Sequence, residues 1–107
     1  MSWIVETLNA TVDAELEALP ADMRAYLQRI VGLIENYGLE QVHGPYIKHL
    51  EDRLWEMRLK GRAGIARAIY VTAVGKRVVI LRAFIKKTQK TPRKELELAH
   101  LRAKEVH

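Results

Sequence analysis

The stretch from Ile65 to Ile85, IARAIYVTAVGKRVVILRAFI, decides the fold of this 107-residue chain. It contains two runs rich in β-branched and aromatic side chains, which favour β-strands. Only Gly75 and Lys76 separate the runs, and a Gly-X pair suits a two-residue type II′ turn. The stretch therefore predicts an antiparallel hairpin in which Val74 pairs with Arg77, between strands at residues 65–74 and 77–85.

The rest of the chain supplies the elements around this hairpin. Apolar side chains recur at helical spacing after Pro20 and up to Gly38, which predicts an amphipathic helix. We treat the region around Gly44 as a loop, and we expect Pro92 to open a closing helix that Thr91 caps. Shorter patterns predict a strand, a brief helix and another strand at residues 3–8, 13–19 and 54–59. The predicted fold class is α+β: a strand, two helices, a three-strand antiparallel meander and a C-terminal helix.

Composition limits the kinds of function open to the chain. Its length suits one domain over residues 1–107, and 49% hydrophobic residues are enough for a core. The chain has no cysteine, which excludes thiolate metal sites and a cysteine nucleophile. No apolar stretch approaches the length of a membrane span, and the acidic N-terminal region lacks a signal-segment pattern. We therefore expect a cytoplasmic protein that does not bind membranes.

The uneven distribution of charge is the strongest functional signal in the residues themselves. The chain carries 18 Lys and Arg against 13 Asp and Glu, for a formal net charge of +5. From Arg58 to Lys94 there are twelve basic residues and no acidic one. A surface that only confers solubility usually mixes both signs, because interspersed charges avoid self-repulsion. The block therefore favours a polyanionic ligand.

The predicted hairpin register determines which cations share a side of the sheet. It places Arg67, Arg82 and Lys86 on one side, together with apolar residues that the closing helix or a partner must cover. Alternation along strand 54–59 leaves Arg58 beside Arg67 on this side. The opposite side, packed under helices, receives Tyr70, Val79 and Leu81, whereas Ile69, Val71, Ile80 and Phe84 join the cations. We predict a cationic cluster on the open face that continues into the following loop: Arg58, Arg67, Arg82 and Lys86, with Lys87, Lys90 and Arg93.

Metal-free phosphate chemistry is the reaction class that these residues fit best. The four histidines lack ligand spacing, and the GRAG segment at residues 61–64 is too short for a phosphate-binding loop. RNA suits such chemistry because its 2′-hydroxyl is a built-in nucleophile. Cleavage needs a proton acceptor, cations on the phosphoryl oxygens and a donor for the leaving oxygen. We predict no metal and no cofactor. Arg58, Arg67 and Arg82 are the predicted clamps on the phosphate oxygens, and Lys86 or Lys87 is the predicted acid or base.

Several segments together resemble the RelE/ParE toxin superfamily, most closely its HigB-like, phage-derived branch. These segments are LWEMRL at residues 54–59, ARAIYV at 66–71, VVILRAFIKKTQKTP at 78–92 and the closing helix. The N-terminal strand and paired helices are also similar, so the likeness covers nearly the whole chain. The resemblance carries catalytic roles to Arg58, Arg67, Lys86 and Lys87, whereas Arg82 depends on the register alone. We add neighbouring cations as RNA-binding residues: Lys60, Arg62, Lys90 and Arg93.

The resemblance implies a type II toxin: a ribosome-associated endoribonuclease that cuts mRNA and is neutralised by a cognate helix-turn-helix antitoxin. The protein would meet operator DNA only through that antitoxin. Two other functions stay open, a ParE-like inhibitor of DNA gyrase and a non-catalytic nucleic-acid-binding module. Cations on strands favour the endoribonuclease, because strands hold geometry. We expect Arg67→Ala, or Lys86→Ala with Lys87→Ala, to abolish toxicity without changing the thermal unfolding midpoint.

Overall fold

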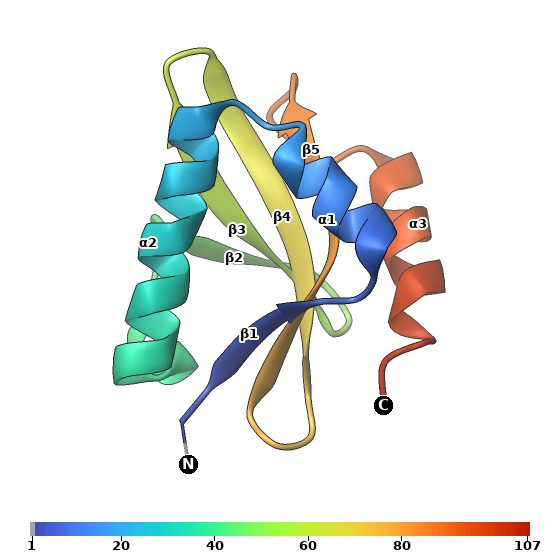
Figure 1. Ribbon diagram of the computed structural model, residues 1–107. Coiled ribbons are helices and arrows are strands. Elements are labelled where there is room, and N and C mark those ends of the chain that lie inside the picture. Colours follow the sequence, from blue (N-terminus) through green and yellow to red (C-terminus); the bar gives the residue numbers. More distant parts are fainter. Residues whose placement is uncertain (1) are drawn as a thin grey trace.

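The computed structural model describes residues 2–107, which form a five-stranded mixed sheet with three α-helices (Figure 1). The strand order is β1-β5-β4-β3-β2; β1 runs parallel to β5, and the other neighbours are antiparallel. The strands are β1 (Ile4–Thr7), β2 (Ile47–Glu51), β3 (Leu54–Gly61), β4 (Gly64–Ala73) and β5 (Arg77–Lys86). The helices are α1 (Ala10–Glu17), α2 (Ala21–Tyr37) and α3 (Arg93–Ala103), with a 3-10 turn η1 (Leu39–Gln41) after α2.

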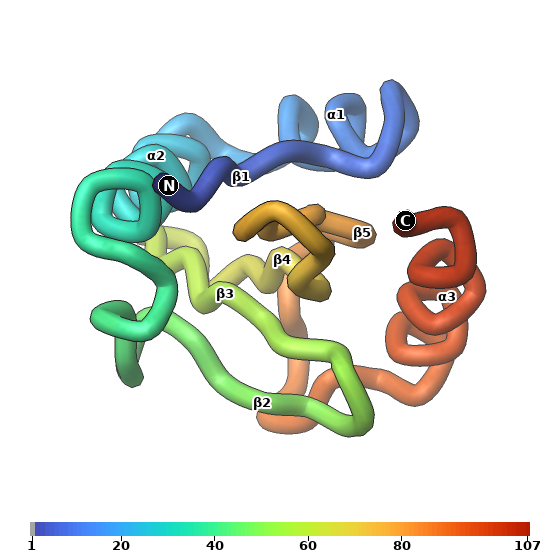
Figure 2. The backbone as a smooth tube through the Cα atoms, turned by 90° about the horizontal axis from the view of Figure 1, so that it is seen from below, coloured from blue at the N-terminus to red at the C-terminus, as the bar shows by residue number. Residues whose placement is uncertain are grey.

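The helices cover the sheet from both sides. Figure 2 shows α1 and α2 along one face of the sheet and α3 beside β5 on the other. The larger core lies under α1 and α2 and includes Met23, Ile30, Ile34, Met57, Leu59 and Tyr70. A smaller core lies under α3 and includes Ile69, Val71, Val79, Leu81, Ala99 and Ala103. The closing helix therefore covers Ile69, Val71 and Phe84 on the predicted cationic side, as one of the two expected alternatives, whereas Ile80 lies in the larger core.

The α+β architecture is confirmed, with one strand that the sequence patterns missed. β2, IKHLE, lies in the region predicted as a loop and extends the meander to four strands. Three of its five residues are charged or histidine, which hides the strand pattern. An edge strand tolerates this composition because one of its sides has no neighbouring strand. Among residues 2–107, no helix combines the length and apolar character needed to cross a membrane.

The turn between β4 and β5 differs from the predicted two-residue turn. Ala73, not Val74, pairs with Arg77, so the connection contains three residues. Gly75 and Lys76 have positive φ angles of 89° and 56° within it. Glycine adopts this left-handed region without a steric penalty, and hairpins with three-residue loops commonly end in it. The prediction was wrong here because a Gly-X pair fits either loop length.

The longer turn shifts the register by one residue over the half of the hairpin next to it. An irregularity beyond Ile69 restores the predicted pairing, so that Ile69 lies opposite Arg82 as expected. On β5, the side chains between the turn and this irregularity point to the side opposite to the predicted one, whereas Tyr70 and Val71 of β4 lie on their predicted sides. Val79 and Leu81 therefore pack under α3, whereas Ile80 joins the core under α1 and α2.

Candidate nucleic-acid interface

One face of the sheet collects basic side chains from four adjacent strands. Arg58 of β3 pairs with Arg67 of β4, and Lys86 of β5 lies two residues beyond the partner of Arg67. Paired residues on neighbouring strands point to the same side, so these three cations share a face, as the sequence predicted. We call this side of the sheet the basic face, and it carries six cations around one carboxylate, Glu56: Lys48, Arg58, Lys60, Arg67, Arg82 and Lys86.

A buried ion pair lies at the centre of the basic face. Arg67 Nη1 donates to Glu56 Oε2 at 2.6 Å; the Glu56 side chain is fully buried, and Arg67 is 3% exposed. Burial, reinforced by nearby Arg58, lowers the pKa of Arg67 although Glu56 acts in the opposite direction. Arg67 Nε is buried without a hydrogen-bond partner among residues 2–107. Arg67→Ala would therefore leave a buried carboxylate unpaired, so an unchanged unfolding midpoint is no longer expected.

Glu56 also attaches the loop that follows β5. The Thr91 hydroxyl donates to Glu56 Oε1 at 2.8 Å. The predicted cap at Thr91 is therefore wrong: Pro92 is the N-cap residue of α3 and makes no side-chain capping bond. Sequence reasoning missed Glu56 because it stands two residues before the acid-free block. The available signal was its alternation with Arg58 on β3, which places both on one face.

A cleft of about 790 Å³ opens beside this pair. It lies between β2, the end of β5, the following loop and the start of α3, and its charged lining comprises Lys48, Glu51, Glu56, Lys86, Lys90 and Arg93. Burial, followed by repulsion from Arg67, lowers the pKa of Lys86. Among residues 2–107, no carboxylate lies within ion-pair distance of Lys48, Lys86 or Lys90. These ammonium groups are therefore available to an anionic ligand.

Arg82 lies on the same face, but carboxylates surround its guanidinium. Its Nε donates to Glu95 Oε1 of α3 at 2.8 Å, and its Nη1 lies 3.0 Å from Glu15 Oε2 of α1. Arg102 also binds Glu15, at 2.9 Å, and donates to the Leu81 carbonyl at 2.7 Å. The hydrogen bonds to Glu95, followed by the charge of Glu15, raise the pKa of Arg82. This network joins α1 and α3 to β5 and keeps Arg82 apart from the cleft cations.

The remaining predicted site residues, which are the catalytic candidate Lys87 and the four RNA-binding cations, occupy different positions. Lys60 and Arg62 are exposed at the β3–β4 end of the sheet, where the Arg62 backbone N–H donates to Asp22 Oδ2 at 2.7 Å. Lys87 is exposed just beyond β5 and does not line the cleft. Lys90 lines the cleft, as does Arg93, although an ion pair with a carboxylate of β2 engages the Arg93 guanidinium.

A second polar cluster closes the cleft where β2 approaches α3. Glu51 accepts hydrogen bonds from Arg93 Nη1 at 3.0 Å and contacts His100 Nε2 at 2.6 Å. The hydrogen bonds from Arg93 and then His100 lower the pKa of Glu51 to about 2. Glu51, Asp52 and His100 could together offer three metal ligands, but Arg93 already supplies a positive charge to Glu51. The arrangement acts as an ionic link between an edge strand and a helix.

Comparisons with known proteins agree with this architecture. Residues 14–104 match the family described as phage derived protein Gp49-like. A mutant of the E. coli toxin RelE, solved in the free state, superposes with a TM-score of 0.64 and 14% identity, covering 95% of this chain and 98% of that chain. The archaeal RelE–RelB complex from Pyrococcus horikoshii OT3 contains a chain with a TM-score of 0.58 and 21% identity, covering 81% and 98%. No curated protein matches the sequence. The fold is RelE-like, in agreement with the resemblance seen in the sequence.

Proposed function

The chain belongs to the phage-derived Gp49-like family, and on this premise we propose that it is the toxin of a type II toxin–antitoxin system. Its activity in this proposal is endonucleolytic cleavage of mRNA on the ribosome. One observation carries the proposal: Lys48, Lys86 and Lys90 converge on a cleft without carboxylate partners, next to Arg58 and the buried Glu56–Arg67 pair. Such a cluster of like charges favours a polyanion, because a polyanion relieves the repulsion between them.

The proposed reaction uses the RNA itself as nucleophile. The 2′-hydroxyl gives its proton to a base, and its oxygen attacks the adjacent phosphorus. The bond to the 5′-oxygen of the next nucleotide breaks, and that oxygen takes a proton, leaving a 2′,3′-cyclic phosphate and a 5′-hydroxyl. Lys86 is the proposed base, because its lowered pKa increases the neutral fraction that accepts a proton. Lys90, which lines the cleft, is the candidate donor to the leaving oxygen, and Lys87, outside the cleft, would bind the RNA backbone beyond the cut.

The two central arginines receive different roles. Arg58 is half-buried on β3, and its planar guanidinium can bind two phosphoryl oxygens of the reacting phosphate. Arg67 is almost fully buried against Glu56, so we assign it as a positioning residue. Its charge lowers the pKa of Lys86, and through Glu56 it orients Thr91 and the loop that carries Lys90. Arg82 serves the fold in this proposal, because Glu15 and Glu95 engage it.

The partner we propose is a cognate antitoxin that covers the basic face. The RelE–RelB complex supports a protein partner, since a chain of the same fold is solved there together with RelB. Helix-turn-helix character of the antitoxin comes from the sequence resemblance. Operator DNA would then be reached only through the antitoxin, and the toxin would act in the cytoplasm, where mRNA is translated.

Mapping mRNA ends after induction in a bacterium tests the proposal. We expect cuts within translated frames, and about a hundredfold less cleavage by Lys86→Ala, in line with loss of a general base. Lys104→Ala, at an exposed lysine just after α3, is the matched control and should cleave like the unmodified protein. Circular dichroism must show the same fold for both variants.

The two alternatives predict different results in the same experiment. Intact transcripts together with DNA damage would indicate gyrase inhibition and contradict RNA cleavage. Normal growth and intact transcripts under strong induction would indicate a silent binding module. Cleavage by Lys86→Ala at the unmodified rate would reject the assigned base while leaving the toxin proposal in place.

A further inference from the structure

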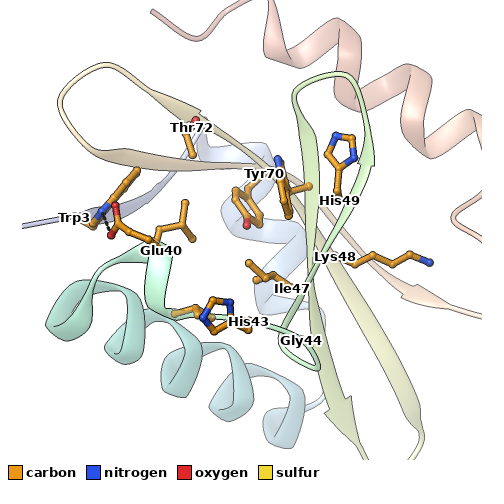
Figure 3. Close-up of a pocket in the computed structure, with 12 residues that line it drawn as sticks. Trp3, Glu40, His43, Gly44, Ile47, Lys48, His49, Tyr70 and Thr72 are labelled. Carbon is orange, nitrogen blue, oxygen red and sulfur yellow. Dashed lines mark hydrogen bonds between the residues drawn. The ribbon is translucent and has the colours of Figure 1, made fainter.

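A second cavity lies on the other side of β2 from the cleft (Figure 3). Its volume is about 570 Å³, and five of the twelve residues that line it carry an aromatic or imidazole ring: Trp3, His43, His49, Trp55 and Tyr70. The chain has two tryptophans, and both line this cavity. Trp55 is 37% exposed, and its ring meets His49 edge-on with centroids 4.9 Å apart. Large aromatic surfaces that remain accessible favour a planar ligand.

Tyr70 contributes a hydroxyl to the wall of this cavity. The Tyr70 side chain is 1% exposed, and no hydrogen bond joins its hydroxyl to any of residues 2–107. Figure 3 shows this hydroxyl directed into the cavity, near Ile47. Burial raises the pKa of Tyr70, so the hydroxyl keeps its proton at neutral pH. The hydroxyl is accessible from the cavity, where a ligand could form a hydrogen bond with it.

The edge strand β2 connects this cavity to the basic cleft. His49 pairs with Trp55 and faces the aromatic cavity, whereas Lys48 pairs with Glu56 on the basic face. Lys48 and His49 line both hollows. Because β2 is the outermost strand, a chain molecule in the cleft has to pass only one strand to reach the aromatic cavity.

We propose that the aromatic cavity is a nucleobase subsite, which takes one unpaired base of the RNA strand held in the cleft. This inference rests on the proposed function and deepens it. The base would stack on Trp55 and Trp3, as single-stranded nucleic acids do on aromatic side chains. The Tyr70 hydroxyl would bond to the base edge, as would Glu40, whose carboxylate already accepts a hydrogen bond from Trp3 Nε1 at 3.1 Å. These polar contacts would give the enzyme a base preference at a position flanking the cut.

Tryptophan fluorescence tests the subsite, because both tryptophans lie in it. The probe is a hexanucleotide with 2′-O-methyl groups, which binds without being cleaved. We expect a saturable change in tryptophan emission with the full-length protein. Trp55→Ala should weaken binding of the labelled hexanucleotide about tenfold, a typical effect of losing one stacking side chain. Tyr70→Phe removes only the hydroxyl and should weaken binding about threefold, which is within the range of free energies that one hydrogen bond contributes.

A matched control lies outside the cavity. Tyr37→Ala removes another exposed aromatic ring, 69% exposed at the end of α2, and should leave binding unchanged. One result would overturn the subsite and leave the cleft proposal in place. In that result the hexanucleotide binds, tryptophan emission does not change, and Trp55→Ala binds the hexanucleotide as tightly as the unmodified protein. Adenosine 5′-monophosphate separates the two proposals further. Saturable quenching that survives Lys86→Ala with Lys87→Ala supports the subsite even if no RNA is cleaved.

Failure of both probes to change the emission of the folded protein would overturn the subsite. The same conclusion would follow if the emission responds only to a protein partner, which would assign the cavity to a partner's side chain.

Discussion

Arg58 and Arg82 lie on the same face of one sheet, yet their surroundings are opposite. Glu15 and Glu95 bind Arg82 from two helices, α1 and α3. Among residues 2–107, no carboxylate comes within ion-pair distance of Arg58. A guanidinium that is already paired and hydrogen-bonded contributes to the fold, whereas an unpaired one is free to bind phosphate.

The Glu56–Arg67 pair lies between these extremes. Both side chains are nearly inaccessible to water, so the pair belongs to the fold. The second carboxylate oxygen of Glu56 nevertheless accepts a hydrogen bond from Thr91, in the loop that borders the cleft. The comparison therefore divides the basic face into a structural half near α3, a buried pair in the middle and an unpaired half at the cleft.

The largest expected effect is on the buried pair. Arg67→Met should lower the free energy of unfolding by about 3–5 kcal/mol, because it leaves the Glu56 charge buried without its partner. Urea denaturation at pH 7 measures this loss. The double variant Arg67→Met with Glu56→Leu should recover most of it, since two apolar side chains replace both charges. A double variant as unstable as the single one would show that the pair's charges are not the source of the loss.

Arg82 and Arg58 should respond in opposite ways to the same substitution. Arg82→Met should cost about 2 kcal/mol of unfolding free energy, since hydrogen bonds to two carboxylates are lost. Arg58→Met should change stability by less than about 0.5 kcal/mol, as surface substitutions usually do, but should reduce mRNA cleavage. Denaturation and end mapping on both proteins measure the two quantities. Equal stability losses would contradict the division of the basic face.

The smallest effect concerns acid and the link between β2 and α3. The pKa of Glu51 is lowered from 4.5 to about 2, so this carboxylate stabilises the fold above pH 4.5 and loses that contribution as the pH falls towards 2. The difference in thermal midpoint between the unmodified protein and Glu51→Gln should therefore shrink as the pH falls below 4.5. Glu105→Gln, at an exposed carboxylate, serves as the control. A difference that grows in acid would contradict the assignment.

The periodic elements of the fold could be predicted from the sequence, because local residue patterns determine them. The amphipathic spacing after Pro20 and the two β-rich runs around Gly75 correspond to α2, β4 and β5. The prediction of side-chain direction failed at the β4–β5 turn, where one residue more or fewer changes the side of the sheet that a residue faces. A three-residue turn in place of two reversed the direction of Ile80 and its neighbours, because side chains alternate along a strand.

The amino-acid sequence by itself determined that the chain has an acid-free basic block, that much of this block lies on β-strands and that Arg58, Arg67 and Lys86 share a face. Only the tertiary structure decided which of the cations are neutralised. The deciding carboxylates come from distant segments: Glu15 of α1 meets Arg82 of β5, and Glu51 of β2 meets Arg93, 42 residues away along the chain. Charge pairing depends on distances between atoms in space, and local sequence patterns do not contain those distances.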